Sequence, residues 1–403
     1  AELMTLAMKN AIVRRDVSHL IFPDEVQIQP AAKGDKASNS NGRVAAEAIT
    51  PPESAVKAAC KAISKAKRPL IIVGYGTRDS MSAVIKLAEK LRCPVVTTFK
   101  AKGQIGDKHP HAAGVIGRSG TPIASWFMNE ADLLMVFGAS FSNHTGIEPS
   151  KPIIQVDFEQ MALGKFHPVD IPVWGEVGVT ARAFVKGLGK KNAMDQRREL
   201  AERWKMWRRE KASRRKEDRG KGLNSAVVFH ELSKLAPRNA VIAVDVGNNT
   251  YSFGRYFECK DQRVLMSGYL GSIGFSFPAA MGAWAATQVD GEHKGRPVIS
   301  VSGDGGFGQY MAEITTAVKY RMNITHILLN NHELGKISKE QIAGNWQVWQ
   351  TSLHNPSFAA YAKICGARGF KVTKANEIGP AIKAALAYDG PSLVEIITDA
   401  ELI

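Results

Sequence analysis

Short apolar runs alternate with amphipathic stretches in the first half of the chain. The amphipathic stretches carry apolar residues at helical spacing, whereas the runs between them are apolar almost throughout. Wholly apolar strands between amphipathic helices indicate a parallel sheet that is covered on both faces. The predicted strands are residues 69–76, 93–99, 132–140 and 152–158, and the predicted helices are residues 54–67, 81–92 and 123–131.

The same alternation starts again in the second half. Two such series in one chain predict an α/β protein with two doubly wound parallel-sheet domains. The predicted strands of the second series are residues 240–247, 297–304, 324–331 and 392–398, and its helices are residues 225–236, 275–288, 311–321, 356–367 and 378–388.

The pattern divides the chain into five segments. A stretch with almost no apolar periodicity is typical of a linker, and a dense run of Lys and Arg separates the two series. The segments are a remnant of a third domain (1–27, whose residues 18–27 suggest a helix followed by a strand), a linker (28–52), a central domain (53–187), a basic connector (188–222) and a second domain (223–403).

Composition places the chain among globular proteins. It has 403 residues, of which 44% are hydrophobic and 23% charged. No apolar run reaches the roughly 18 residues that span a bilayer, and no signal peptide is evident, so we expect a cytoplasmic protein without membrane contact. The four cysteines are too scattered for a zinc site or a disulfide framework, and we expect them to be small buried apolar residues.

The formal net charge of +15 is concentrated in the connector. Residues 203–222 contain ten Lys or Arg and three acidic residues, with Trp204 and Trp207 at helical spacing. Basic residues interleaved with aromatic ones can bind nucleic acid. We favour a solvated connecting helix whose tryptophans dock on a neighbouring domain, because the segment matches no nucleic-acid module, and we expect no nucleic-acid partner.

A glycine loop follows one strand of the second series. Gly303, Gly305 and Gly308 fit the pattern G-x-G-x-x-G, which lets backbone N–H groups approach a phosphate. Asp304 lies inside this loop, where its carboxylate would repel a bare pyrophosphate unless a cation stood between them. A dinucleotide site would instead carry an acidic residue after the next strand.

The next strand ends in two amides, Asn330 and Asn331. If the two strands are neighbours, Asp304 and Asn331 emerge together at the carboxyl edge of the sheet. A carboxylate, an amide oxygen, a main-chain carbonyl and two diphosphate oxygens make an octahedral oxygen site suited to Mg²⁺. The loop therefore predicts a magnesium–diphosphate site.

The combination of G-D-G, 24 further residues and N-N resembles the cofactor signature of thiamine diphosphate enzymes. The resemblance implies that Asp304 and Asn331 are side-chain ligands of the metal and that Glu333 contributes its main-chain carbonyl. It also implies that backbone N–H groups bind the diphosphate at three glycines, Gly305, Gly306 and Gly335.

Two further segments resemble the same family. In residues 269–283, Ile273 occupies the position of an apolar residue that bends the cofactor, and the Gly271 carbonyl would accept a hydrogen bond from the aminopyrimidine. The bent form brings the amino group close to the thiazolium carbon that becomes the nucleophile. The remaining residues that the resemblance places at the cofactor are Gly247, Asn248, Asn249 and Ile337.

The central domain is similar to that of the pyruvate oxidase and acetolactate synthase group, whose members often bind FAD there. The usual pair of an acid or tyrosine with an arginine is replaced here by Ser142-Asn143-His144. We still expect FAD as a further cofactor. The matching segments are residues 74–76, 116–121, 138–146 and 156–165.

The segment 334–341 resembles the pyruvate oxidases. There Glu340 aligns with a glutamate over the thiazolium, which makes it the candidate catalytic residue for proton transfer. The alternative is an exposed carboxylate at a helix start. Lys336 replaces an aromatic residue of the oxidases, and Trp346 and Trp349 either line the substrate pocket or belong to the core.

These resemblances imply thiamine diphosphate- and Mg²⁺-dependent decarboxylation of a 2-oxo acid, most simply pyruvate, followed by oxidation. The alternatives are carboligation to an acetolactate-type product and, from another class, a non-catalytic cofactor- or nucleic-acid-binding subunit. The family implies a homodimer or homotetramer in which a pyrimidine-binding domain completes the site. Only residues 1–27 resemble that domain, so we expect a fragment of a longer enzyme, in preference to one half of a two-chain enzyme, with little activity alone.

Overall fold

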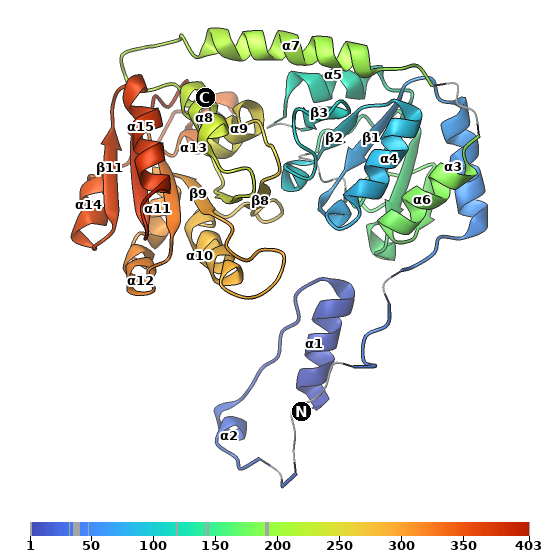
Figure 1. The fold of residues 1–403 in the computed structure, drawn as a ribbon, viewed down its shortest axis with the longest axis horizontal. Helices are drawn as coiled ribbons and strands as arrows, with labels where there is room; N and C mark the ends of the chain where they lie inside the picture. The colour runs from blue at the N-terminus through green and yellow to red at the C-terminus, as the bar shows by residue number, and fades with distance from the viewer. Residues whose placement is uncertain are drawn as a thin grey trace.

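Two parallel six-stranded sheets, each covered by helices on both faces, form the body of the protein (Figure 1). The computed structural model describes residues 2–31, 33–34, 41–46, 48–117, 120–140, 142, 145–189 and 193–402. This confirms the α/β class and the two doubly wound domains predicted from the apolar pattern.

The first sheet belongs to the central domain and has the strand order β3-β2-β1-β4-β5-β6. One face packs against α3, α4 and α6, and the other against α5 and α7. The strands are β1 (Pro69–Val73), β2 (Val95–Thr97), β3 (Ala112–Val115), β4 (Leu133–Phe137), β5 (Ile153–Asp157) and β6 (Ile171–Trp174). The helices are α3 (Glu53–Lys65), η1 (Tyr75–Thr77), α4 (Met81–Leu91), η2 (Phe99–Ala101), α5 (Pro122–Glu130), η3 (Gln160–Ala162), α6 (Val177–Gly187) and α7 (Arg197–Arg214).

The second sheet has the order β11-β12-β10-β9-β7-β8. Helices α8, α9 and α15 cover one face, and α10, α11, α12 and α14 cover the other. The strands are β7 (Val241–Val244), β8 (Arg263–Met266), β9 (Val298–Gly303), β10 (Ile324–Asn330), β11 (Arg368–Val372) and β12 (Ser392–Ile397). The helices are α8 (Ser225–Leu235), α9 (Asn248–Tyr256), α10 (Ser276–Thr287), α11 (Asp304–Tyr310), α12 (Glu313–Lys319), α13 (Gly335–Ala343), α14 (Phe358–Ile364) and α15 (Ala375–Leu386).

Several helices begin at a capping side chain. Thr121 precedes Pro122 and accepts a hydrogen bond from Ala124 N, and Glu176 accepts from Gly178 N and Val179 N. Asn224 caps α8 in the same way, by accepting from Ala226 N. Each cap satisfies an N–H group that has no partner inside the helix, and so fixes where that helix starts.

The four strands that the apolar pattern missed are the edge strands of the two sheets, namely β3, β6, β8 and β11. An edge strand has a neighbour on one side only and tolerates residues that a central strand excludes. β6 contains Pro172, and β11 contains Arg368 and Lys371. Their sequences therefore lack the continuous apolar run that predicts a buried strand.

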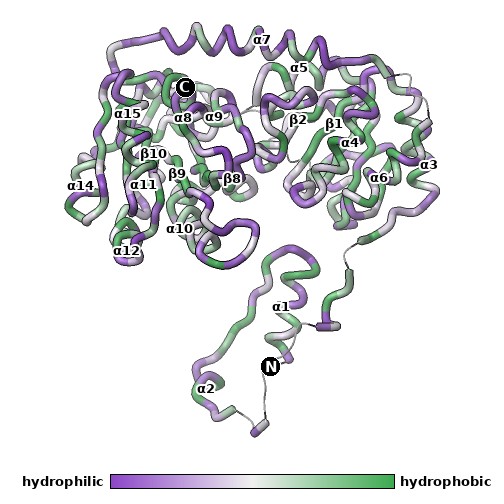
Figure 2. Tube along the Cα trace, viewed as in Figure 1, coloured by the Kyte–Doolittle hydropathy of each residue, from purple (hydrophilic) through white to green (hydrophobic). Residues whose placement is uncertain are grey.

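The basic connector contains α7, which lies across both domains (Figure 1). The indole N–H of Trp204 donates to the carbonyl of Ala112 in the central domain at 2.7 Å. The indole N–H of Trp207 donates to the carbonyl of Arg255 in the second domain at 3.3 Å. Both rings are buried, whereas much of the rest of the helix is hydrophilic (Figure 2). The docked-helix interpretation is confirmed.

Buried charges also join the two domains. Lys102 and Asp107, both from the central domain, lie 3.4 Å apart, and the Asp107 carboxylate accepts the N–H of Cys259 from the second domain at 2.7 Å. On the other side of Cys259, Glu258 pairs with Arg208 and Lys211 of α7. Although the Glu258 carboxyl is largely desolvated, these two cations lower its pKa to about 2.

The N-terminal helices lie outside the two sheet domains (Figure 1), although the guanidinium of Arg15 lies 4.4 Å from the ring centre of Phe158 in the central domain. Helix α1 (Glu2–Arg14) has no buried residue and exposes Leu3, Leu6 and Met8. The strand suggested for residues 18–27 is wrong, because the only regular element there is the short helix α2 (Asp24–Gln27). No neighbouring strand is available for these residues to pair with.

The cysteines are free, as expected, and three of the four are buried. In the part of the chain that the structure describes, no helix is long and apolar enough to cross a membrane.

His326 lies in the middle of β10 with its side chain fully buried. Its Nε2 is 3.0 Å from the hydroxyl of Ser302, and the rings of Phe277 and Phe307 pack against it. Burial lowers the pKa of His326 to about 3, so the imidazole is neutral in the folded protein.

This burial predicts acid sensitivity. The unfolded chain binds a proton at His326 below about pH 6.5, whereas the folded chain does so only near pH 3. The free energy of unfolding should therefore fall by about 1.4 kcal/mol per pH unit from this residue alone as the pH drops from about 6.5 toward 3. In urea titrations between pH 7 and 4.5, His326→Gln should show a shallower pH slope than wild type. Equal slopes would contradict the assignment.

The buried pair predicts a second stability effect. Asp107→Ala leaves Lys102 buried without its carboxylate and the N–H of Cys259 without an acceptor. We expect a loss of at least about 3 kcal/mol of unfolding free energy, measured by urea denaturation. Asp389→Ala is the matched control, because both partners of its ion pair with Arg321 are exposed and the pair should contribute almost nothing.

Candidate active site

The candidate site lies at the carboxyl edge of the second sheet. Strands β9 and β10 are parallel neighbours, with Gly303 opposite Leu329. Asp304 follows β9 directly, and Asn331 follows β10 directly. The expected juxtaposition of these two residues at one sheet edge is therefore confirmed.

Asp304 begins α11 and is almost fully buried, at 2% exposure. One carboxylate oxygen accepts the N–H of Gly305 at 3.1 Å, and the other accepts the side-chain amide of Asn355 at 2.7 Å. Burial raises the pKa of Asp304, and the hydrogen bond from Asn355 acts in the opposite direction. A buried carboxylate that no cation neutralises is favourably disposed toward a bound metal ion.

The segment predicted as a glycine loop before a helix is itself helical. The predicted single helix 311–321 corresponds to α12, and α11 already starts at Asp304. A Cβ at Gly305 would lie 2.5 Å from Leu334 Cδ2, and one at Gly306 would lie 2.9 Å from Asp245 Oδ2. Gly306 therefore lies against a carboxylate that is held in place by hydrogen bonds, whereas the side-chain end of Leu334 beside Gly305 could shift.

Asn331 and Glu333 lie in a tight turn after β10. The side-chain oxygen of Asn331 accepts the N–H of Glu333 at 3.1 Å, and Glu333 pairs with Ser352 in an antiparallel bridge. Between them, His332 has a φ of +57°, a strained conformation for a residue other than glycine. The turn fixes the backbone at the residue whose carbonyl is the predicted third ligand.

Asn248 supplies the observation that tests whether the site fits a diphosphate. Its side-chain Nδ2 is buried and has no hydrogen-bond partner among the residues that the structure describes, and it lies 2.5 Å from where a Cβ of Gly335 would be. A buried amide N–H group without an acceptor is costly. An anionic ligand between α9 and α13 would provide the acceptor, so the residues present fit the cofactor.

Gly247 and Asn249, the two neighbours of Asn248, differ from it in role. Gly247 has a φ of +119°, which only glycine adopts readily, and it precedes α9. The side-chain amide of Asn249 donates to the carbonyl of Asp245 at 3.0 Å. That N–H group is thus engaged in holding the turn, and Asn248 is the better placed donor for a ligand.

Ile273 and Gly271 lie between β8 and α10, in a segment held by a buried carboxylate. Asp245, at the end of β7, accepts the N–H of Gly274 at 2.9 Å and both the N–H and the hydroxyl of Ser276. Desolvation raises the pKa of Asp245, while these hydrogen bonds stabilise its charged form. Because Asp245 also packs on Gly306, one carboxylate connects the Ile273 segment to the glycine loop.

Helix α13 carries the candidate catalytic residue Glu340 on its exposed face. Glu340 forms an ion pair with Lys336 one turn earlier, and Ile337 is 44% exposed beside them. Lys336 also lies 5.8 Å from the ring centre of Tyr251. Glu340 is the sixth residue of the helix, so the alternative of a carboxylate at a helix start is wrong, while its catalytic role stays a prediction.

Trp346 and Trp349 follow α13 and are 69% and 66% exposed. The interpretation that they belong to the core is therefore wrong. The side chain of Gln341 binds the backbone N–H and carbonyl of Trp349 and holds this segment against the helix. Both indoles remain available to a substrate or to another domain.

The FAD-like segments of the central domain have a structural explanation that needs no ligand. A Cβ at Gly74 would lie 2.0 Å from the carbonyl of Gly138, and one at Gly76 would lie 2.9 Å from Gly138 Cα. Backbone packing between the turns after β1 and β4 therefore requires these glycines. Parts of the other segments lie outside the described residues: Arg118, Ser119, Phe141, Asn143 and His144.

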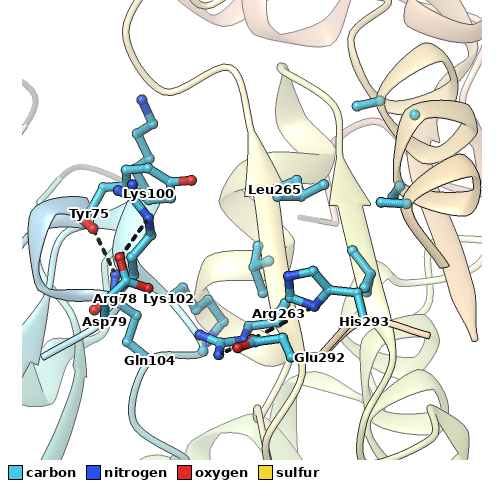
Figure 3. A pocket seen from close by; sticks show the side chains of 17 residues that line it. Tyr75, Arg78, Asp79, Lys100, Lys102, Gln104, Arg263, Leu265, Glu292 and His293 are labelled. Carbon is cyan, nitrogen blue, oxygen red and sulfur yellow. Dashed lines mark hydrogen bonds and ion pairs between the residues drawn. The ribbon is translucent and has the colours of Figure 1, made fainter. Parts of the chain in front are cut away.

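A cavity of about 510 Å³ lies between the two domains, away from Asp304 and Asn331. Figure 3 shows Tyr75, Arg78 and Lys100 on the side of the central domain, and Arg263 paired with Glu292 on the other. Arg78 and Lys100 lie 4.6 and 4.9 Å from the ring centre of Tyr75. The cavity includes Tyr75 of one predicted FAD segment but none of the predicted metal ligands.

Asp245 and Asn355 are the residues of this site that sequence reasoning missed as individual contributors. The sequence pattern indicated Asp245 only as a neighbour of the predicted cofactor residues Gly247, Asn248 and Asn249. Asn355 lies 51 residues from its partner Asp304 along the chain. In the described part of the chain, no group of three His, Cys, Asp or Glu side chains could hold a metal by itself. Amide, main-chain and cofactor oxygens would have to complete the coordination.

Two family models match this chain. The C-terminal TPP binding domain of thiamine pyrophosphate enzymes matches residues 245–396, and the central domain of these enzymes matches residues 56–184. The chain belongs to the thiamine pyrophosphate enzymes, in the group that includes the acetolactate synthases.

Three relatives illustrate the similarity. The chain is 32% identical to the "Putative thiamine pyrophosphate-containing protein YdaP" of Bacillus subtilis, over 98% of this chain and 67% of that protein. It is 30% identical to the "Probable acetolactate synthase large subunit" of Methanococcus aeolicus, over 85% of this chain and 60% of the relative. It is 26% identical to the "Acetolactate synthase isozyme 2 large subunit" of Escherichia coli, over 87% and 63%. The chain thus spans about two thirds or less of the length of each.

The position of Asp245 predicts a measurable effect on the cofactor. In Asp245→Asn the new NH₂ group must face Gly274 or Ser276, whose N–H groups are also donors. We expect thiamine diphosphate affinity, measured by calorimetric titration, to fall by at least about tenfold. Asp157→Asn is the control, because Asp157 is a similarly buried carboxylate at the end of β5 in the other domain. A loss of affinity in both variants would indicate general destabilisation instead.

Proposed function

We propose that the second domain binds thiamine diphosphate through Mg²⁺, with side-chain ligands from Asp304 and Asn331 and the main-chain carbonyl of Glu333. The observation that carries this proposal is the unpartnered, buried amide of Asn248 beside Gly335, next to a buried carboxylate without a cation. Gly305, Gly306 and Gly335 would offer backbone N–H groups to the diphosphate, and Ile273 would support the bent cofactor.

When bound, thiamine diphosphate would supply a nucleophilic carbon for the carbonyl of a 2-oxo acid and a cationic ring that stabilises the electron pair left behind by CO₂. The side chains of the protein would orient the substrate and carry protons. The cation of Lys336 is positioned to attract the carboxylate of an acidic substrate, and Glu340, one turn away, is a candidate proton carrier. Their ion pair would have to open when substrate arrives.

For the reaction we propose carboligation of the acetolactate synthase type, with pyruvate as the simplest 2-oxo acid. Several relatives of this chain are named acetolactate synthase large subunits, which supports ligation over oxidation. Oxidation of the pyruvate oxidase type is the second candidate. It is favoured by the segment 334–341 and by the position of Glu340 within it.

We further propose that the site is completed by a pyrimidine-binding domain from a longer chain or a partner, in a homodimer or homotetramer. The segments that carry Gly271 and follow α13 expose large apolar side chains, which suits a surface that another domain covers. They include Tyr269 at 75% and Leu270 at 85%, with Trp346 and Trp349 on the opposite segment. Binding of FAD in the central domain and a cytoplasmic location complete the proposal.

The cofactor site is tested by calorimetric titration of the purified chain with thiamine diphosphate, with and without Mg²⁺. We expect binding that requires Mg²⁺ and is lost in Asp304→Ala. The control is Asp290→Ala, since Asp290 is exposed and paired with Lys294. If no binding occurs, the titration is repeated with a pyrimidine-binding domain added, and continued failure would exclude the proposed site.

The reaction is tested by incubating the loaded protein with pyruvate. Carboligation should yield acetolactate, detected as acetoin after acid treatment, without net consumption of an oxidant. Oxidation would instead yield acetate or acetyl phosphate together with the reduced acceptor, and a yellow protein would indicate bound flavin. Pyruvate consumption without acetolactate would overturn the carboligase assignment.

A further inference from the structure

A chain of hydrogen bonds connects the interior of the second sheet to Asp304. It starts at Glu395 in β12, which is 1% exposed. One oxygen of Glu395 accepts the side-chain amide of Asn330 at 2.9 Å. The other accepts the hydroxyl of Ser357 at 3.2 Å and the backbone N–H of Ala359 at 3.0 Å. Hydrogen bonds, and not a cation, thus surround this buried carboxylate.

The chain continues through two amides. The side-chain oxygen of Asn330, itself 1% exposed, accepts the amide of Asn355 at 3.0 Å. The same NH₂ group of Asn355 donates to Asp304 Oδ2 at 2.7 Å. Three side chains therefore separate Asp304 from the backbone of α14.

The direction of this chain is forced at its inner end. The backbone N–H of Ala359 can only donate, and the Ser357 hydroxyl also donates inward because its oxygen accepts from Ala360 N. Glu395 can therefore only accept, and Asn330 must turn its NH₂ group toward it. The oxygen of Asn330 then faces Asn355 and also accepts the backbone N–H of His332 at 3.3 Å, which holds Asn330 in the same orientation. The NH₂ group of Asn355, and not its oxygen, therefore reaches Asp304.

A reversed chain would weaken the metal site. With the oxygen of Asn355 against Asp304, two acceptors would face each other in a buried environment, where such a contact is costly. The Asp304 side chain would rotate away from this contact, which displaces a ligand of the metal.

We propose that Glu395 is a positioning residue: it fixes the orientation of the amides of Asn330 and Asn355 and thereby holds Asp304 ready as a charged metal ligand. This inference rests on the proposed function, because it concerns the metal site of that cofactor. The sequence pattern alone could not indicate it, since Glu395 reads as an isolated charge in an apolar strand.

The test reverses the direction of the hydrogen-bond chain by a substitution that keeps the size and shape of the side chain. In Glu395→Gln, the amide oxygen must serve Ala359 N, so the new NH₂ group points at the NH₂ group of Asn330 and forces both asparagines to turn. We expect the affinity for Mn²⁺ in the presence of thiamine diphosphate, measured by electron paramagnetic resonance, to fall by about 10- to 100-fold.

The decisive variant exchanges the two groups. In Glu395→Gln with Asn330→Asp, the NH₂ group of residue 395 meets a carboxylate at 330, which again accepts from Asn355. Asn330→Asp alone places two carboxylates face to face and should also weaken Mn²⁺ binding. We expect the double variant to recover most of the lost affinity, and the unfolding free energies of the four proteins to show the same strong coupling.

Each outcome decides a different point. Wild-type affinity in Glu395→Gln, with or without a change in stability, would overturn the positioning role. Independent effects of the two substitutions on stability would overturn the forced direction of the chain. If the wild type itself binds no Mn²⁺ with thiamine diphosphate, the proposed function fails and the metal role of Glu395 with it, while the stability comparison still decides the direction.

Discussion

A carboxylate buried without a cation constrains the whole site. Asp245 has lost its hydration, and among the described residues the donors that replace the lost water come from the turn after β7 and from the segment that carries Ile273. Because an unsatisfied buried charge costs far more than a normal hydrogen bond gains, these donors cannot move independently. Gly306 packs on the same carboxylate, so the glycine loop is fixed to the two other segments. The precision of the site follows from this one energetic requirement.

The two parallel sheets supply the frame in which this constraint operates. The carboxyl ends of β7, β9 and β10 are adjacent because these strands are neighbours in one sheet, which places Asp245, Asp304 and Asn331 at one edge. The core beneath them is apolar except for His326, Glu395 and a few hydroxyl groups. The carboxylate of Glu395 and the Nε2 of His326 have defined partners, and these hydrogen bonds make the edge more rigid than apolar packing alone would.

The features that the sequence predicted correctly are those that depend on local pattern. Central strands are apolar because both faces are covered, and the spacing from Asp304 to Asn331 corresponds to the crossover through α11 and α12 and the following strand β10. The edge strands and Asn355 could not be predicted in this way. Strand β11 has the sequence RGFKV, which a loop could also have. The role of Asn355 depends on the fold, because the segment before α14 brings it beside Asn330 at the end of β10. The exposure of Trp346 likewise depends on what surrounds it in space.

Helix α7 ties the two halves of the molecule through one indole on each side. It follows that the domains are not interchangeable modules, although each has its own sheet. A hybrid protein that joins the central domain of one relative to the catalytic domain of another would bring together two surfaces that never evolved against the same helix. If the junction lies before Arg197, the helix comes with the second domain, and the surroundings of Ala112 must be adjusted to Trp204. If the junction lies after Arg214, the helix comes with the central domain, and the surroundings of Arg255 must be adjusted to Trp207. The connector, and not the sheets, is where such recombination has to be designed.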